Sequence, residues 1–266
     1  MDDVIFDFIS KEIKSNKTVA MALITKSSGS IPAKEGSILL VFEDGSISGT
    51  VGGGVLENEV IKECKKSLRT HENNLYTYSL AADADLGAQC GGKAEIFIKI
   101  FRPKEKIIIA GGGHIGLKLY EISKTLGLHI VIIDDREEFV SKERFPQAQE
   151  LICGNIYEGL KNYDINQNTY VVIVTRGHEY DEDALRAVIN KNPGYIGMIG
   201  SKKKVKHTFD NLRQDGVDEE FIERVYAPIG LDINGNSPAE IALSIMTQIQ
   251  FIKKGGTLNH KKDVKK

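Results

Sequence analysis

A short apolar run that leads into a glycine-rich turn constrains the fold of this chain more than any other stretch. Residues 106–116 read Lys-Ile-Ile-Ile-Ala-Gly-Gly-Gly-His-Ile-Gly, in which Gly111, Gly113 and Gly116 fill the G-x-G-x-x-G spacing. Between a strand and a helix, such glycines allow a tight turn, the approach of a pyrophosphate and close packing of the helix on the strand. A phosphate would bind the free N–H groups where the helix begins, near His114.

The residues after this turn extend the pattern into a βαβ unit. An amphipathic helix pattern follows, Gly127 stands where that helix ends, and residues 129–133 form a second apolar strand. This strand ends at Asp134, where an acid that binds ribose is expected, while Arg136 suits a ribose 2′-phosphate. Because 26 glycines in 266 residues produce chance matches, it is this context that predicts a mononucleotide-binding fold. Binding of NAD(P) itself stays open, since folds outlive their ligands.

Composition limits the class of protein to which the chain can belong. A hydrophobic fraction of 41% and a charged fraction of 27% are typical of globular proteins. The net charge of −2 gives no reason to expect a nucleic acid or a membrane as partner. The acidic N-terminus is unlike a signal peptide, and no apolar run approaches the ~18 residues of a membrane span, so a cytoplasmic protein is expected.

The three cysteines lack the spacing of a disulfide framework or a cysteine zinc site. Cys64 falls on an apolar helix stripe and Cys153 ends a strand, so both are expected in the core. Cys90 differs because it stands beside Gly91 and Gly92, where access is unhindered and backbone N–H groups favour the thiolate. We therefore expect a reactive or ligating thiol at Cys90, although a small buried residue is the common alternative.

Two domains are predicted to meet at the short, charged, proline-containing stretch of residues 102–106. Residues 1–103 are expected to form a smaller α+β domain. Residues 104–254 are expected to form a Rossmann-like, doubly wound parallel sheet, because strand and helix patterns alternate there. Residues 255–266 are typical of a disordered basic tail. The fold class is therefore α/β.

Apolar periodicity places the elements of both domains. In the first, it predicts helices over 4–14 and 55–68, strands over 19–25, 37–42, 46–51, 76–80 and 94–101, and a hairpin at Asp44-Gly45. The second of these helices follows Gly52-Gly53-Gly54, so that a strand, three glycines and a helix occur twice in the chain. In the second domain, it predicts strands at 107–110, 129–133, 150–153, 170–174, 195–199 and 224–226. Ser237, Pro238 and Glu240 mark the start of the last helix with a capping box.

Two loops that follow predicted parallel strands carry residues suited to a ligand. In the first, Arg176 and His178 suit an anion, and His178 with Asp181 suits a metal or a shared proton. Asp181 could instead cap the next helix. In the second loop, Ser201 and Lys202 open a lysine-rich helix start, which favours either a phosphate-type ligand or a merely solvated basic face.

Several stretches together resemble the XdhC/CoxI family, which serves molybdenum hydroxylases such as xanthine dehydrogenase. They occur in the family's order from about residue 18 to residue 253: Ser28-Gly29-Ser30 with Pro32, Gly49 to Glu57, Cys90-Gly91-Gly92, Gly111 to Gly116, Asp134-Asp135-Arg136, Thr175 to His178 with Asp181, Ile199 to Lys202, and Pro228 to Asp232. It is the set that carries the resemblance. Val55 departs from the cysteine that some CoxI-like members have there, which tilts the match toward the XdhC-like branch.

The resemblance implies an accessory protein rather than a turnover enzyme. Such a protein would bind molybdenum cofactor (molybdopterin), protect it during sulfuration and insert it into a xanthine dehydrogenase-like molybdenum hydroxylase. A homodimer and a cysteine desulfurase as a further partner are also implied. The expected cofactor-binding residues are Gly52, Gly53, Gly54, Glu57, Gly91, Gly92, Gly111, Gly113, His114, Gly116, Asp134, Arg176, His178, Ser201 and Lys202, with Cys90 as the thiol and no metal site of the protein's own.

The chemistry of the cofactor agrees with these residues. A phosphate suits the glycine-rich turn at Gly111 to Gly116, and a planar, hydrogen-bonding pterin suits exposed glycine backbone. We expect the glycine-rich faces of the two domains to meet, because ligand sites are common at domain interfaces.

Two other functions stay open at this point. One is an NAD(P)-dependent oxidoreductase that uses the Gly111 turn and Asp134, for which the residues show no clear proton-transfer partner. The other is a metal-dependent hydrolase built around His178 and Asp181.

Overall fold

The computed structural model describes residues 2–29, 34–79 and 92–263. The chain divides into two compact units, residues 1–103 and residues 104–266, each of which has its own sheet and core. None of the helices in the described residues is long and apolar enough to cross a membrane.

Unit 1 is an antiparallel five-stranded sheet with the strand order β3-β2-β1-β5-β4. Its elements are α1 (Asp2–Lys14), β1 (Val19–Ser28), β2 (Ile38–Phe42), β3 (Ile47–Gly49), α2 (Gly54–Thr70), β4 (Asn74–Ser79) and β5 (Lys93–Phe101). The alternation along β5 explains the layers, because Ala94, Ile96, Ile98 and Ile100 are buried while the residues between them are not. These residues share a core with Leu56, Val60 and Cys64 of α2.

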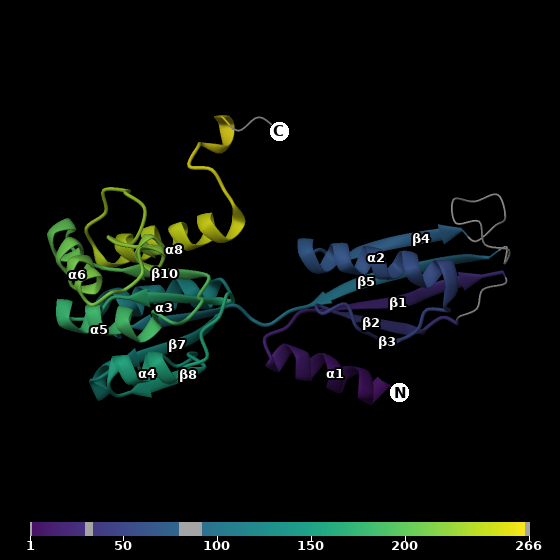
Figure 1. Cartoon of the computed structure of the whole chain (residues 1–266), viewed down its shortest axis with the longest axis horizontal. Helices are drawn as coiled ribbons and strands as arrows, with labels where there is room; N and C mark the ends of the chain where they lie inside the picture. The colour runs from purple at the N-terminus through teal and green to yellow at the C-terminus, as the bar shows by residue number, and fades with distance from the viewer. Residues whose placement is uncertain (1, 30–33, 80–91, 264–266) are drawn as a thin grey trace. The chain divides into compact units, whose positions relative to one another are not determined.

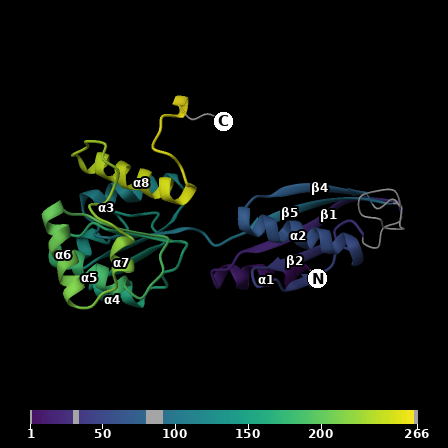
Figure 2. The same ribbon diagram turned by 45° about the horizontal axis from the view of Figure 1, so that its top comes forward.

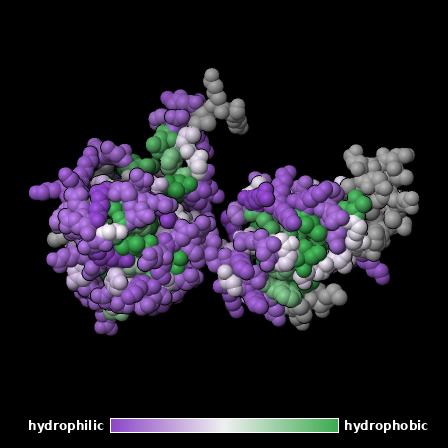
Figure 3. Space-filling view, in the orientation of Figure 1, coloured by the Kyte–Doolittle hydropathy of each residue, from purple (hydrophilic) through white to green (hydrophobic). Residues whose placement is uncertain are grey.

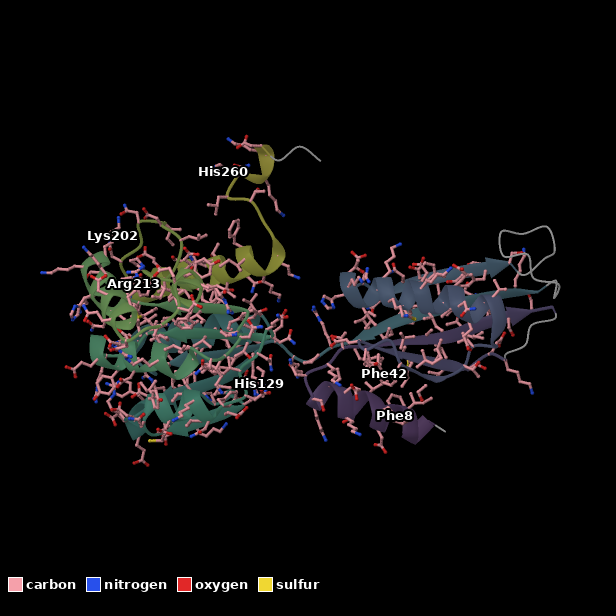
Figure 4. The ribbon with its side chains drawn as sticks, viewed as in Figure 1. Phe8, Phe42, His129, Lys202, Arg213 and His260 are labelled. Atoms are coloured by element: carbon pink, nitrogen blue, oxygen red, sulfur yellow. The ribbon has the colours of Figure 1, made fainter. Side chains whose placement is uncertain are left out.

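The other face of this sheet contacts α1. Ile9 of α1 packs in a small cluster with Val19 and Leu40, and the rings of Phe8 and Phe42 lie 6.4 Å apart at their centroids (Figure 4). The predicted hairpin at Asp44-Gly45 is confirmed, since the Phe42 amide donates to the Ser46 carbonyl across the turn.

Unit 2 is a six-stranded parallel sheet with the order β11-β10-β9-β6-β7-β8. Its elements are β6 (Lys106–Ala110), α3 (His114–Thr125), β7 (His129–Asp134), η1 (Glu137–Phe139), β8 (Glu150–Cys153), α4 (Ile156–Asn162), β9 (Thr169–Ile173), α5 (His178–Val188), β10 (Tyr195–Met198), α6 (Lys202–Gln214), α7 (Glu219–Glu223), β11 (Val225–Tyr226), α8 (Pro238–Lys254) and η2 (Lys261–Asp263). The predicted doubly wound sheet is confirmed.

Helices cover both faces of this sheet because its central strands are apolar on both sides. Along β6, Ile107 and Ile109 pack with α3 and α8, whereas Ile108 and Ala110 pack with α4, α5 and α6 (Figures 1 and 2). The chain leaves β6 for β7 on one side and reaches β9 on the other, so the order reverses between β6 and β9. Ligands of such sheets bind at this reversal.

Two local predictions for unit 2 have opposite outcomes. The capping box is confirmed: the Ser237 hydroxyl accepts from the Glu240 amide, and the Glu240 carboxylate accepts from the Ser237 amide. The prediction that Cys153 lies in the core is wrong, because Cys153 is the last residue of the edge strand β8 and its side chain is exposed. The other cysteine expected in the core, Cys64, is buried.

Candidate functional site

A cleft of about 500 Å³ opens at the carboxyl edge of the unit 2 sheet, where the strand order reverses. It is formed by the loops that follow β6, β7 and β9 and by the start of α8. Its lining residues are Gly113, His114, Ile115, Arg136, Phe139, Val174, Thr175, Arg176, Asn236, Pro238 and Ile241. Three of the predicted ligand residues, Gly113, His114 and Arg176, are therefore brought together here.

The glycines of the turn after β6 have different physical roles. A Cβ on Gly111, whose φ is +117°, would lie 2.3 Å from the Val174 carbonyl oxygen, and one on Gly116 would lie 2.1 Å from the Gly111 carbonyl oxygen. These two positions tolerate only glycine for packing. A Cβ on Gly113 would meet nothing within 4 Å. Gly113 thus leaves open the space in front of α3 that a phosphate group would occupy.

The two helices that begin beside the cleft lack side-chain caps. Gly113 precedes α3 and Gly177 precedes α5, and neither helix has a side-chain hydrogen bond at its N-cap. The other helices longer than one turn in unit 2 are capped by Asn155, Ser201, Asp218 and Ser237. The first N–H groups of an uncapped helix are ready donors for an anion, and the helix dipole favours negative charge there.

Asp134, the predicted ribose ligand, is engaged inside the protein. Its Oδ2 accepts from the Gly112 amide at 2.8 Å and from Nη2 of Arg136 at 3.0 Å, and its Oδ1 accepts from the amide and Nε of Arg136 at 3.1 and 2.9 Å. Burial alone would raise the pKa of Asp134, but the hydrogen bonds from Arg136 and Gly112 outweigh it and lower the pKa. All four acceptor positions are filled, so contact with a ribose would require Arg136 to move.

Two residues that the sequence reasoning missed hold the glycine turn in place. Arg144 donates from Nε to the Gly112 carbonyl at 3.0 Å and from Nη2 to the Gly113 carbonyl at 3.2 Å. The ring of Phe139 lies 3.8 Å from the guanidinium carbon of Arg136 and 5.2 Å from that of Arg144. No local motif reveals the contacts of Arg144 with the turn, because they join residues about thirty positions apart.

Arg144→Ala is expected to weaken binding of pyrophosphate by about tenfold, because the turn would lose the donors that fix its two carbonyl groups. Isothermal titration calorimetry at constant pH and salt measures this. The matched control is Arg186→Ala, which removes an arginine that pairs with Glu182 and Asp215 on α5 and after α6 and does not line the cleft. Equal weakening by both variants would contradict a specific role of Arg144.

The loop after β9 is tied to the sheet by its own polar groups. Arg176 donates from Nη2 to Asp135 and to the Tyr180 hydroxyl, both at 2.7 Å, and 44% of its side chain stays exposed. The alternative that Asp181 caps α5 is wrong, because Gly177 is the N-cap and Asp181 lies inside the first turn. There its Oδ1 accepts from the amide and hydroxyl of Thr175.

A metal-binding role for this loop gains no support from the geometry. Of His178, the structure describes only the backbone. Among the side chains that the structure describes, no group of three or more histidine, cysteine, aspartate or glutamate residues is placed to hold a metal ion.

Ser201 and Lys202 do not line the cleft. The Ser201 hydroxyl accepts from the Lys204 amide and caps α6, and Lys202 is the first residue of that helix. A separate, smaller pocket of about 350 Å³ is lined by Ser201, Lys203, Lys204 and His207. The structure therefore separates the lysine-rich start of α6 from the glycine turn.

The predicted residues of unit 1 form a second glycine turn, before α2. Gly52, Gly53 and Gly54 have φ values of +117°, +72° and +62°, a backbone that side chains with a Cβ rarely adopt. Glu57 faces this turn: its Oε2 accepts from the Val51 amide at 3.0 Å, from the Gly53 amide at 3.2 Å and from the Thr50 hydroxyl. Its carboxylate thus supports the turn. A role in ligand binding stays a prediction.

Gly92 is buried, whereas Cys90 and Gly91 lie outside the residues that the structure describes. The reactive or ligating role of Cys90 therefore stays a prediction, as does a meeting of the two glycine-rich faces.

The carboxylate of Glu57 gives unit 1 a predictable response to acid. The hydrogen bond from the Thr50 hydroxyl lowers the pKa of Glu57 below its ordinary 4.5, and together with those from the Val51 and Gly53 amides it outweighs the opposing effect of burial. Because the folded pKa is depressed, this stabilisation is present above pH 4.5 and is lost as the pH falls through the folded value.

Glu57→Gln is expected to lower the free energy of unfolding of unit 1 by about 1 kcal/mol at pH 7, and by progressively less under acid conditions. Urea titrations at several pH values, followed by circular dichroism, measure this. Glu59→Gln is the matched control, since Glu59 lies on the same helix and pairs with Lys62. A loss that stays constant from about pH 7 to about pH 3 would show that charge on Glu57 does not matter.

Comparisons with known proteins agree with this division of the chain. A family model described as the XdhC Rossmann domain matches residues 107–249, and one described as the XdhC and CoxI family matches residues 13–79. YqeB, an uncharacterised protein of Escherichia coli K12, is 33% identical over 253 residues, which cover 94% of this chain and 46% of YqeB. A probable subunit of the xanthine dehydrogenase of Bacillus subtilis 168 is 25% identical over 154 residues, covering 58% of this chain and 44% of that protein. The chain thus spans less than half the length of these relatives.

A solved structure shares the fold of the whole chain. The crystal structure of a xanthine dehydrogenase from Bacillus halodurans aligns with a TM-score of 0.53 over 95% of this chain and 96% of that chain, at 22% identity. At this identity the likeness concerns the fold alone.

Proposed function

Since the chain belongs to the XdhC and CoxI family, we propose that it is an accessory protein that binds molybdenum cofactor and assists its sulfuration and insertion into a xanthine dehydrogenase-type molybdenum hydroxylase. The observation that carries the proposal is the cleft at the strand-order reversal, within the domain that the XdhC Rossmann model matches. Its open glycine and two uncapped helices offer a phosphate site.

The residues of the cleft fit a ligand that joins a phosphate to a planar heterocycle. The amides at the start of α3 would hold the phosphate, beside the exposed His114. Thr175 and Asn236 line the same cleft and offer hydroxyl and amide groups to a hydrogen-bonding ring. The bound cofactor would supply the molybdenum centre, while the protein binds it, orients it and limits its contact with water. Cys90 is proposed as the thiol, a cysteine desulfurase as the sulfur donor, and a homodimer as the working form.

Native mass spectrometry of protein from a molybdenum-replete host tests the proposal. We expect a mass increment equal to molybdopterin with its metal on the wild type, a reduced one on Cys90→Ala and an unchanged one on Cys153→Ala. Cys153 is the matched control because it is also a free thiol and is exposed. Absence of molybdopterin from all three proteins, confirmed by fluorescence of the released and oxidised pterin, would rule out the proposed cofactor.

An NAD(P)-dependent oxidoreductase is the second candidate, and the strand order and the glycine turn favour it. The filled acceptor positions of Asp134 weigh against it, because a ribose diol would have no free carboxylate oxygen there. Titration with NADH and NADPH decides between the two candidates. Saturable binding of either nucleotide at micromolar concentration, without any bound molybdopterin, would favour the oxidoreductase.

A further inference from the structure

The first turns of α6 carry a concentration of positive charge that the chain itself does not neutralise. Lys202, Lys203, Lys204, Lys206 and His207 are all exposed. In the described part of the chain, none of the four lysines forms an ion pair with a carboxylate. Farther along the same helix the situation is the opposite, because Arg213 pairs with Glu219 at 2.6 Å and with Asp210 at 3.4 Å.

This arrangement is unfavourable for the helix alone. Lysines three and four positions apart repel each other, and the positive end of the helix dipole adds to the repulsion. The chain has enough acids to avoid it, with 37 acidic residues against 35 basic ones. The helices α4, α5, α7 and α8 all have acidic residues in the first turn, whereas α6 has none. An external negative charge would remove the cost.

The position of these lysines connects them with the cleft. Because α6 follows β10 of a parallel sheet, it starts at the carboxyl edge, as α3 and α5 do. Lys202 lies at the surface of unit 2 (Figure 4), over which Figure 3 shows mainly hydrophilic side chains. A partner seated on residues 202–207 would therefore meet the edge of the sheet at which the cleft opens.

We propose that residues 202–207, the basic start of α6, are a docking surface for an acidic protein partner. On the function proposed above, that partner is the molybdenum hydroxylase that receives the cofactor. Complementary charge would speed the encounter and fix the partner at the edge where the cofactor leaves the cleft. The net charge of −2 gives the chain no broad cationic face of the kind that nucleic acids need.

Charge reversal tests this proposal. We expect Lys202→Glu/Lys203→Glu/Lys204→Glu to weaken binding of the apo-hydroxylase at least about tenfold at about 50 mM NaCl, mainly through a slower association rate, and wild-type binding to weaken at about 300 mM NaCl. Biolayer interferometry on the full chain measures both. The matched control is Lys124→Glu/Lys161→Glu/Lys254→Glu, which makes the same charge change at exposed lysines near the C-terminal ends of α3, α4 and α8. Circular dichroism establishes that both variants are folded.

The results separate this proposal from the proposed function. Cofactor content of the α6 variant is expected to stay at the wild-type level, since these lysines do not line the cleft. If the variant binds the hydroxylase as tightly as the wild type, or if the control loses as much affinity, the docking surface is not at α6. A variant that keeps the complex but loses molybdopterin would assign the lysines to the cofactor, and a variant that loses only binding to anionic vesicles would assign them to lipid. Both outcomes overturn the proposal, whereas failure of the proposed function would appear as a wild type without cofactor.

Discussion

Gly112→Ala is expected to lower the free energy of unfolding of unit 2 by about 3 kcal/mol. A Cβ at this position would lie 2.0 Å from the carbonyl oxygen and 3.0 Å from the carbonyl carbon of Phe139. Both are backbone atoms, so no side-chain rotation relieves the clash. The strain would fall on the whole turn, because the Gly112 amide also donates to Asp134 and its carbonyl accepts from Arg144.

Chemical denaturation followed by circular dichroism measures this loss, and Gly113→Ala is the control one position along the same turn. The two glycines are adjacent in the chain but differ in the space around them. If Gly112→Ala cost less than about 1 kcal/mol, the loop that contains Phe139 would have to move away from the turn at little cost. The close packing described above would then not be a constraint on the fold.

The architecture of unit 2 is predictable because its signals are local. Four-residue apolar runs, turns after them and a capping box at Ser237 place strands and the last helix, and the rule that strands alternate with helices then gives a parallel sheet. The G-x-G-x-x-G spacing also identifies the correct turn. The prediction for Cys153 is wrong because strand periodicity does not reveal that β8 lies at the edge of the sheet.

The candidate site is predictable only in part, since its decisive contacts join distant residues. The spacing rule marks Gly111, Gly113 and Gly116 but not Gly112, which lies against the backbone of Phe139 in a later loop. It also leaves out Arg144. The sequence places Asp134 at the correct strand end, but its pairing with the Gly112 amide and the Arg136 side chain cannot be read from that position. Which acceptors remain for a ligand depends on such pairings, and these exist only in the folded chain.

Gly113→Ala is expected to leave the fold intact and to lower the affinity for molybdopterin at least about tenfold, or about 1.4 kcal/mol. Gly113 has φ −66° and ψ −160°, which alanine adopts without strain, and its Cβ would meet nothing within 4 Å. Stability is therefore expected to change by less than about 1 kcal/mol, the cost of replacing glycine by alanine at an N-cap. The new methyl group would occupy the space in front of α3 through which a phosphate reaches the amides.

Thermal denaturation and the molybdopterin content per chain, measured on the same preparation, test both halves of this expectation. With Gly112→Ala the variant makes a pair that separates two demands on one turn: Gly112 is glycine because protein backbone lies against it, and Gly113 is glycine because a ligand must. A Gly113→Ala protein that is stable and fully loaded with cofactor would show that phosphate does not bind at this turn. The uncapped start of α5 would then be the remaining anion site of the cleft.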